Sequence, residues 1–400
     1  MLVHRLRTDA RLVAIGQSVA RQGFSGLAGM ATNILIASSV AATSFAIFSA
    51  AIVAIQIISA WVAFILYPLI YSELSKDASH FRPLCRRLAA PLLAVTIFSG
   101  ILALATVARS EEIESWQVFA VGSGLAASAV LPAFALGLQN YRMFNTLELV
   151  PSVLGLALIA LIRPTSAGDL IVIASVGYLL KSAVYILWLL VTYNSFAVHR
   201  DVDWKAAVRN GAAVGLSGAA QSAAFRAILL SASFTVPASY FVLVAVAWQF
   251  AEKVLVVPQA VNAIMFGQFK RSGTIKGSWK ILALGSAGSL AVILVTLAAL
   301  MFFRETFAGS YDHIAGWFIL VSLLFVAQGV RIMLQNCLNA LGKSRIILWD
   351  AVAMLAANGT ILLVFGVVSA SSVWSLPLYY FLLLASLFVT MRQYLSLGAR

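Results

Sequence analysis

The sequence predicts an all-α integral membrane protein of about twelve transmembrane helices, arranged as two six-helix lobes around a central cavity. Three observations predict this fold: apolar stretches of membrane-spanning length, positive charge confined to alternate gaps, and a weak repeat between the two halves. Of the 400 residues, 62% are hydrophobic, and the mean hydropathy is +0.97. A soluble core does not need so much apolar surface, whereas a helix that crosses lipid requires roughly 20 consecutive apolar residues.

The apolar stretches follow one another so closely that twelve helices use nearly the whole chain. The gaps between them are short, and none is long enough to house a separate soluble domain. The predicted spans are residues 12–37, 44–71, 89–108, 116–139, 146–163, 169–193, 209–231, 238–268, 281–302, 313–340, 346–368 and 375–391.

Most of the 27 Lys and Arg residues lie in the N-terminal segment, in every second gap and at the C-terminus, for example Arg86, Lys205 and Lys343. The positive-inside rule therefore places both termini in the cytoplasm of a bacterial inner-membrane protein. Topology and anionic headgroups account for the net charge of +13, so no nucleic-acid partner is expected. The first span contains Arg21 and lacks a small-residue cleavage site, which predicts a retained helix rather than a signal peptide.

Residues 25–68 and 217–258 begin alike, with Ser-Gly and further small residues, and then cross a short polar gap. Each then enters a long helix with a central Trp that meets a proline, Pro68 or Pro258, near its cytoplasmic end. This order favours parallel repeats about an axis along the membrane normal. The alternative is that small-residue packing patterns recur by chance. The predicted N-lobe is residues 1–197, the cytoplasmic linker 198–208 and the C-lobe 209–400.

Five cations lie well inside the predicted spans, where each costs roughly 2.5–3.5 kcal/mol at a helix centre unless it faces protein or water. Polar neighbours recur near them at helical spacing, which predicts a hydrated internal cavity of positive potential that attracts an anion. The cations are Arg21, Lys181, Arg226, Lys253 and Arg331, and the polar cavity candidates are Gln249, Gln259, Asn262, Gln328, Gln335 and Asn339.

Three acidic residues are candidates for coupling transport to an ion gradient: Glu252, Glu148 and Asp350. Glu252 is the first candidate, because it lies in the middle of a span beside Lys253, which can tune its proton affinity. The alternative is that these acids are simple charge partners that lock helices together. We expect Arg331, Lys253 and Lys181 to line the cavity, so that neutralising each one reduces transport and leaves insertion intact.

No motif for catalysis, nucleotide binding or a metal is found, so no enzyme activity and no cofactor are expected. Gly342-Lys343-Ser344 matches the last residues of the phosphate-binding loop motif, but Cys337 occupies the position at which the motif requires a glycine. The histidines lack ligand spacing, and the two cysteines define no disulfide framework.

Residues 325–365 carry the most specific pattern, FVAQGVRIMLQNCLNALGKSRIILWDAVAMLAANGTILLVF, in which a small residue and a Leu-Gly-Lys turn precede a new apolar helix. Residues 131–156 and 65–77 supply supporting matches. On these residues the chain resembles the O-antigen and exopolysaccharide flippases, the polysaccharide-transport branch of the MOP (multidrug/oligosaccharidyl-lipid/polysaccharide) superfamily.

This resemblance implies a MATE-like fold whose cavity opens alternately to either side of the membrane. It also implies a polyprenyl-diphosphate-linked oligosaccharide as cargo, an ion gradient as energy source, and membrane lipid, a polysaccharide polymerase and chain-length machinery as partners. Related flippases of peptidoglycan precursors place cations on the first and eighth helices, which here carry Arg21 and Lys253. Residues 38–45 depart from the family pattern, because they lack its usual Gly-Pro or Gly punctuation.

Two other functions fit parts of the sequence. A MATE-type multidrug antiporter shares the fold, but its cavity is more often acidic, and the first helix here carries no acid within its membrane part. An integral-membrane polysaccharide polymerase or ligase usually needs an extended extracytoplasmic loop. The gaps available for such a loop, for example 109–115 and 303–312, are short.

Overall fold

The computed structural model is helical throughout the residues that it describes, with no strand among them. Eleven helices of this part are long and apolar enough to cross a membrane, and a further helix covers residues 23–39. The predicted all-α membrane fold is confirmed, although the first half of the first predicted span lies outside the described residues. The described residues are 20, 23–106, 112–195, 201–259, 278–303, 305, 311, 313–368 and 375–398.

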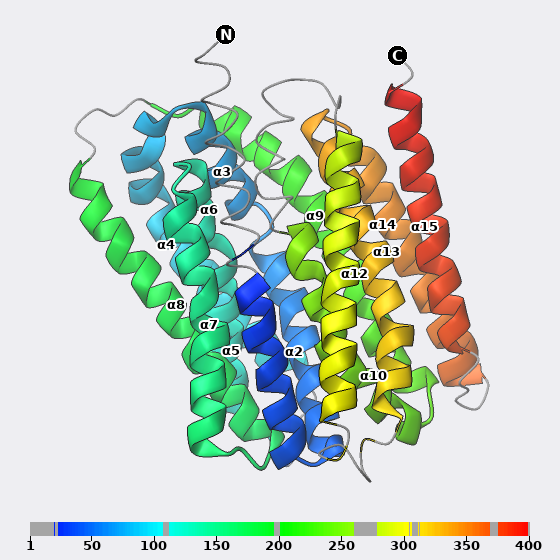
Figure 1. Ribbon diagram of the computed structural model, residues 1–400. Helices are drawn as coiled ribbons and strands as arrows, with labels where there is room; N and C mark the ends of the chain where they lie inside the picture. Colours follow the sequence, from blue (N-terminus) through cyan, green and yellow to red (C-terminus); the bar gives the residue numbers. More distant parts are fainter. Residues whose placement is uncertain are drawn as a thin grey trace, which may run out of the picture.

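The helices form two groups that stand side by side, with the first half of the chain on the left of Figure 1 and most of the second half on the right. We call them the N-lobe and the C-lobe. The N-lobe contains the helix at 23–39, α2 (Ala42–Val62), α3 (Leu66–Lys76), η1 (Ala78–His80), α4 (Phe81–Thr106), α5 (Ser115–Val130), α6 (Pro132–Gly137), α7 (Tyr141–Ile162) and α8 (Ala167–Ser195). The C-lobe contains α9 (Trp204–Thr235), α10 (Ala238–Ala251), η2 (Glu252–Leu255), α12 (Ser278–Phe302), α13 (Ile314–Ala340), α14 (Ser344–Leu362), the π-helical η4 (Leu363–Val368) and α15 (Ser375–Gly398).

The two ends of the bundle differ in charge. The end at which α3 and α13 finish and α4 and α14 begin carries Lys76, Arg82, Lys343 and Arg345, and we call it the basic end. The other end, where α2 and α13 begin, is called the distal end. Helix α9 begins at the basic end with Trp204, inside the predicted linker 198–208, because the Asp203 carboxylate accepts a hydrogen bond from the Ala206 N–H at 3.1 Å and caps the helix.

Three of the predicted spans are broken helices rather than continuous ones: 116–139, which breaks at Leu131 between α5 and α6, and 44–71 and 238–268. Helix α2 stops before a turn at 63–65, ahead of Pro68, and α10 passes into the 3₁₀ segment η2 ahead of Pro258. Proline has no N–H and its ring clashes with the carbonyl four residues earlier, so each break falls where the sequence places a proline. In 44–71 and 238–268 the break lies a few residues before Pro68 and Pro258, the prolines that the two halves share in the sequence.

Each proline leaves a carbonyl without its helical donor, and the structure places both against the protein. The Val254 carbonyl accepts a hydrogen bond from the Ser289 hydroxyl of α12 at 3.2 Å. The Phe64 carbonyl abuts Gly215 of α9, where a Cβ atom would lie 1.8 Å from the carbonyl oxygen. Only glycine fits there, so the broken helix of the N-lobe packs backbone to backbone on the first helix of the C-lobe.

The lobes are joined at and near the distal end by buried hydrogen bonds. The Asn33 amide donates to the Gln249 carbonyl at 2.9 Å, and the Tyr311 hydroxyl donates to the Val40 carbonyl at 2.9 Å. Burial raises the pKa of Tyr311 from its ordinary value of 10, at which the hydroxyl is already a protonated donor at neutral pH, to about 12. A continuous apolar core that includes Phe45 and Phe225 surrounds these contacts, so the described helices of the two lobes pack together on this side.

We predict that Gly215→Ala lowers the stability of the purified protein by about 1–3 kcal/mol, because the new methyl group forces α3 and α9 apart. The measurement is the midpoint of thermal unfolding in detergent. Gly218→Ala is the matched control, since no atom lies within 4 Å of the position of its Cβ. The control should unfold at the same temperature or slightly higher, as alanine favours a helix over glycine by about 0.5–1 kcal/mol. Equal midpoints for both variants would contradict the close contact.

Candidate functional site

Three connected cavities lie between the lobes. The outer chamber, of about 520 Å³, is bounded mainly by α2, α3, α9 and α13 and runs from mid-bundle towards the basic end. The inner chamber, of about 230 Å³, shares with it Gln221, Gln259 and Asn336, so the two are continuous. The side chamber, of about 150 Å³, extends into the N-lobe and meets the inner chamber at Glu252.

The charged groups of these chambers gather at the inner end. Arg226 of α9 lies 3.8 Å from a Glu252 carboxylate oxygen, measured from Nη2, and each side chain is about a quarter exposed, at 25% and 24%. The Arg226 Nε also donates to the Gln56 amide oxygen of α2 at 2.7 Å, and Nη1 donates to the Ser222 hydroxyl. Arg226 therefore links the two lobes in the middle of the bundle.

Lys253 lies in the 3₁₀ break that Pro258 imposes on α10, directly after Glu252. Its side chain runs across to the helix at 23–39, where a Cβ atom on Gly29 would be 2.7 Å from the lysine Cε. It lines the side chamber together with Gln56, Ser152 and Tyr178. In the described part of the chain no carboxylate pairs with this ammonium, and the chambers hold two cations against one acid.

Two of the five predicted cavity cations lie elsewhere, which corrects the expected placement. Lys181 is 5% exposed and bonds to Glu148 at 2.7 Å, tying α8 to α7 within the N-lobe. The Arg331 side chain is fully buried and contacts Asp350 at 2.7 Å. Neither cation is among the residues that line the three chambers. Lys181 and Arg331 each form an ion pair with a carboxylate of a neighbouring helix, so Glu148 and Asp350 act here as their charge partners.

Asp350 of α14 is the centre of a buried polar network that joins three helices of the C-lobe. It accepts hydrogen bonds from Arg331 and from the Gln335 amide of α13, the latter at 3.1 Å, and from the Ser386 hydroxyl of α15 at 2.8 Å. Arg331 in turn donates to the Gln328 amide oxygen at 3.2 Å. A buried ion pair is tolerated only when such additional hydrogen bonds satisfy it.

The polar candidates from the sequence divide between chamber walls and this network. Gln259 lines the outer and inner chambers, Asn339 the outer, Gln328 the inner and Gln249 the side chamber. Gln335 belongs to the Asp350 network instead. Arg21 and Asn262 lie outside the described residues.

Several chamber residues were missed from the sequence: Gln56, Asn210, Gln221 and Asn336. Each is an uncharged amide within or beside an apolar span. In the sequence each of them is a single amide among apolar and small residues. A search for charged residues inside predicted spans does not find such amides.

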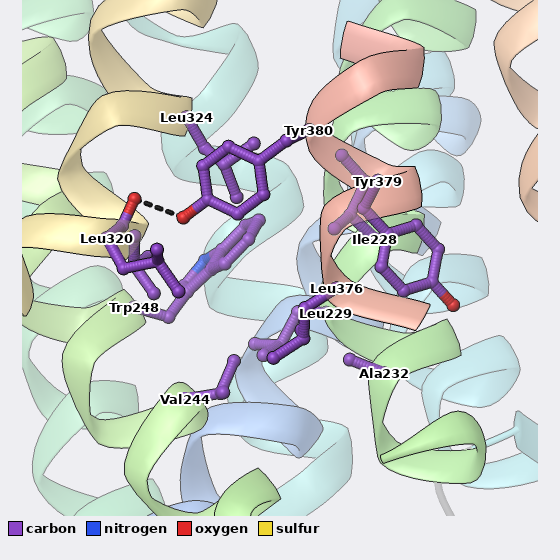
Figure 2. Close-up of a pocket in the computed structure, with 11 residues that line it drawn as sticks. Ile228, Leu229, Ala232, Val244, Trp248, Leu320, Leu324, Leu376, Tyr379 and Tyr380 are labelled. Carbon is purple, nitrogen blue, oxygen red and sulfur yellow. Dashed lines mark hydrogen bonds between the residues drawn. The ribbon is translucent and has the colours of Figure 1, made fainter. Parts of the chain in front are cut away.

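A further pocket in the C-lobe is a packing defect rather than a ligand site. Figure 2 shows Trp248, Tyr380 and Leu324 facing one another across it, with Tyr379 to one side. Its volume is about 10 Å³, the lower limit for a single water molecule. The Tyr380 hydroxyl donates to the Leu320 carbonyl, and the Tyr379 hydroxyl is 3.1 Å from the Thr235 hydroxyl.

Comparison with solved structures identifies the fold. The chain matches an outward-facing multidrug resistance MATE family transporter of the MOP superfamily with a TM-score of 0.65 and 12% identity, over 95% of this chain and 94% of that one. An inward-facing multidrug resistance MATE family transporter of the MOP superfamily matches with a TM-score of 0.61 and 14% identity, over 93% of both chains. A MATE protein in its straight conformation matches with a TM-score of 0.60 and 14% identity, over 96% of this chain and 94% of that one. No family model and no curated protein matches.

The protein is therefore an integral membrane protein with the fold of the MATE transporters. At such low identity the likeness concerns the fold alone. The MATE-like architecture expected from the sequence is confirmed, and membership of the polysaccharide-transport branch stays a prediction.

We predict that Asp350→Ala destabilises the protein by about 3–5 kcal/mol, because it leaves the Arg331 guanidinium buried without a counter-charge. The measurement is the yield and thermal midpoint of monodisperse protein in detergent. Lys253→Gln should fold normally, since it removes a cation that has no carboxylate partner among the described residues.

The double variant Arg331→Met, Asp350→Leu separates charge from packing. It should recover most of the stability that Asp350→Ala loses, because both charges are then absent. A double variant as unstable as Asp350→Ala would show that volume, not charge, dominates at this position.

Proposed function

We propose that the protein is a secondary transporter that moves its cargo across the membrane by alternating access. The supporting observation is the chamber between the two lobes, which runs towards the basic end, while buried hydrogen bonds join the described helices of the two lobes near the distal end. Rocking of one lobe against the other would open the distal end and close the basic end. If the basic end faces the cytoplasm, as the positive-inside rule predicts, this arrangement is the cytoplasm-facing one.

For the cargo, our first candidate is a polyprenyl-diphosphate-linked oligosaccharide, carried from the cytoplasmic to the periplasmic leaflet for cell-surface polysaccharide synthesis. Its support is the charge at the inner end, where Arg226 and Lys253 face one acid, Glu252. Cationic donors of this kind bind phosphate oxygens more strongly than neutral donors do. The apolar exterior of the bundle would leave the polyprenyl tail in the bilayer.

The second candidate is a MATE-type multidrug antiporter, and the comparisons favour it over the flippase, because the similar structures are described as multidrug transporters. A cationic drug would need an acid in the chamber. Glu252 is the carboxylate that the described lining offers, and Arg226 already faces it. The third interpretation, a polymerase or ligase, receives no support from the comparisons.

Glu252 remains our proposal for the group that couples transport to an ion gradient. It lines both the inner and the side chamber, and it stands between Arg226 and Lys253. Protonation of Glu252 would remove the counter-charge of Arg226 and make the chamber more positive.

We predict that Arg226→Gln and Lys253→Gln each reduce translocation of a lipid-linked oligosaccharide by roughly 10–100-fold, since each removes a charged hydrogen-bond donor to the diphosphate. The measurement is protein-dependent flipping in reconstituted liposomes, scored by protection of the saccharide from an added glycosidase. Lys343→Gln, an exposed cation of the basic end, is the matched control and should flip at the wild-type rate. Normal rates in both chamber variants would contradict a diphosphate at the inner end.

A second measurement separates the two candidate cargoes. Cells that overproduce the wild-type protein should gain no resistance to organic cations, because the described charges of the chamber repel them. Broad cation resistance that is lost in Glu252→Gln, together with no flipping in liposomes, would reject the flippase and establish the antiporter.

A further inference from the structure

We propose that the outer chamber is a saccharide subsite that holds uncharged sugars of the cargo, while Arg226 and Lys253 hold its diphosphate at the inner end. This inference rests on the proposed flippase function. It adds two claims to that function: the diphosphate and the sugars of the cargo occupy different chambers, and the sugars are uncharged.

The first observation is the separation of charge from amides along the cavity. Among the described residues, those that line the outer chamber include no charged side chain, whereas the inner and side chambers hold Arg226, Glu252 and Lys253. The polar wall of the outer chamber consists largely of carboxamides. Each carboxamide both donates and accepts hydrogen bonds, as sugar hydroxyls do. These carboxamides are Asn210, Gln221, Gln259, Asn336 and Asn339.

The second observation is an unpartnered donor at the junction of the outer and inner chambers. Gln221 is 8% exposed, and its Nε2 has no hydrogen-bond acceptor among the described residues. Buried amide groups are nearly always paired, so this N–H is a donor that an oxygen of a bound ligand would satisfy. Gln249 Nε2, beside the side chamber, is unpaired in the same way. Because Gln221 lines both chambers, that oxygen would belong to the part of the cargo where the first sugar meets the diphosphate.

The third observation is an aromatic wall that faces these amides. Tyr67 and Tyr71 of α3 stack with ring centroids 6.4 Å apart and planes inclined by 19°, and Phe64 and Phe144 adjoin them in the lining. Flat apolar walls with a few well-placed polar groups are typical of small-molecule sites, and 520 Å³ lies within their range of about 300–1,000 Å³. From Asn210 to Gln221, α9 advances about 16 Å, so the chamber is elongated, as a short sugar chain requires.

The same lining excludes acidic sugars and organic cations from the outer chamber. A uronate carboxylate would lie there without a cation among the described lining residues, and a cationic drug would lie there without a carboxylate. Desolvating a charge without a counter-charge is strongly unfavourable. The chamber therefore favours hydroxyl-rich, uncharged groups over both.

The experiment compares the binding of three lipids to purified, detergent-solubilised protein by native mass spectrometry. The probes are undecaprenyl diphosphate alone, the same lipid carrying N-acetylglucosamine, and the same lipid carrying glucuronic acid. The variants are Asn210→Leu and Asn339→Leu, whose side chains line the outer chamber but not the inner one, Arg226→Gln in the inner chamber, and Gln393→Leu on α15 as a matched control outside the chambers.

We expect Asn210→Leu and Asn339→Leu to weaken binding of the N-acetylglucosamine lipid about tenfold each and to leave binding of the bare lipid within about twofold. Arg226→Gln should weaken binding of both the bare and the N-acetylglucosamine lipid, and Gln393→Leu should change the binding of neither. The wild-type protein should bind the glucuronic acid lipid less tightly than the N-acetylglucosamine lipid.

Equal losses for bare and glycosylated lipid in the two outer-chamber variants would overturn the inference, as would no loss for either lipid or tighter binding of the acidic sugar. In each of those cases the wild-type protein still binds the lipids, so the flippase function would stand. A wild-type protein that binds none of the three lipids would overturn the proposed cargo and this inference together.

Discussion

Two proline-imposed breaks in transmembrane helices shape the contact between the lobes and the inner end of the chambers. A helix in lipid must satisfy its backbone groups within the protein, so a break is tolerated only where neighbouring groups or a cavity take over the lost hydrogen bonds. Pro68 and Pro258 impose such breaks on α2 and α10, and the protein uses both. One freed carbonyl packs against Gly215 and fixes the contact between the lobes. The other break holds Glu252 and Lys253 beside the chambers.

The buried cations serve two different purposes, which their partners distinguish. Lys181 and Arg331 each bind a carboxylate within their own lobe, and the Arg331 pair is completed by hydrogen bonds from Gln335 and Ser386. Such pairs hold helices in register. Arg226 instead contacts both lobes and remains partly exposed to a chamber, and Lys253 has no ion-pair partner among the described residues. Charges that are left available in this way can bind a ligand.

Hydropathy and spacing were enough to predict the helices, because lipid imposes one length and one composition on every span. They could not predict the breaks in the spans 44–71 and 238–268, since the apolar run continues through a turn. The same limit applies to the cations. Sequence spacing shows that Arg331 and Lys181 face protein, but whether a carboxylate meets them depends on how α14 and α7 are rotated in the bundle. The amides of the outer chamber, such as Gln221, could not be singled out, because an isolated amide is common in membrane helices.

The hydrogen bonds that join the lobes near the distal end are asymmetric in a way that affects how they can be lost. In both, the acceptor is a main-chain carbonyl, of Gln249 or Val40, and only the donor is a side chain, Asn33 or Tyr311. Replacing Val40 by another residue of similar shape leaves its carbonyl in place, whereas replacing Tyr311 by phenylalanine removes the bond entirely. Each of these two hydrogen bonds between the lobes therefore depends on one side chain, that of Asn33 in the N-lobe or that of Tyr311 in the C-lobe.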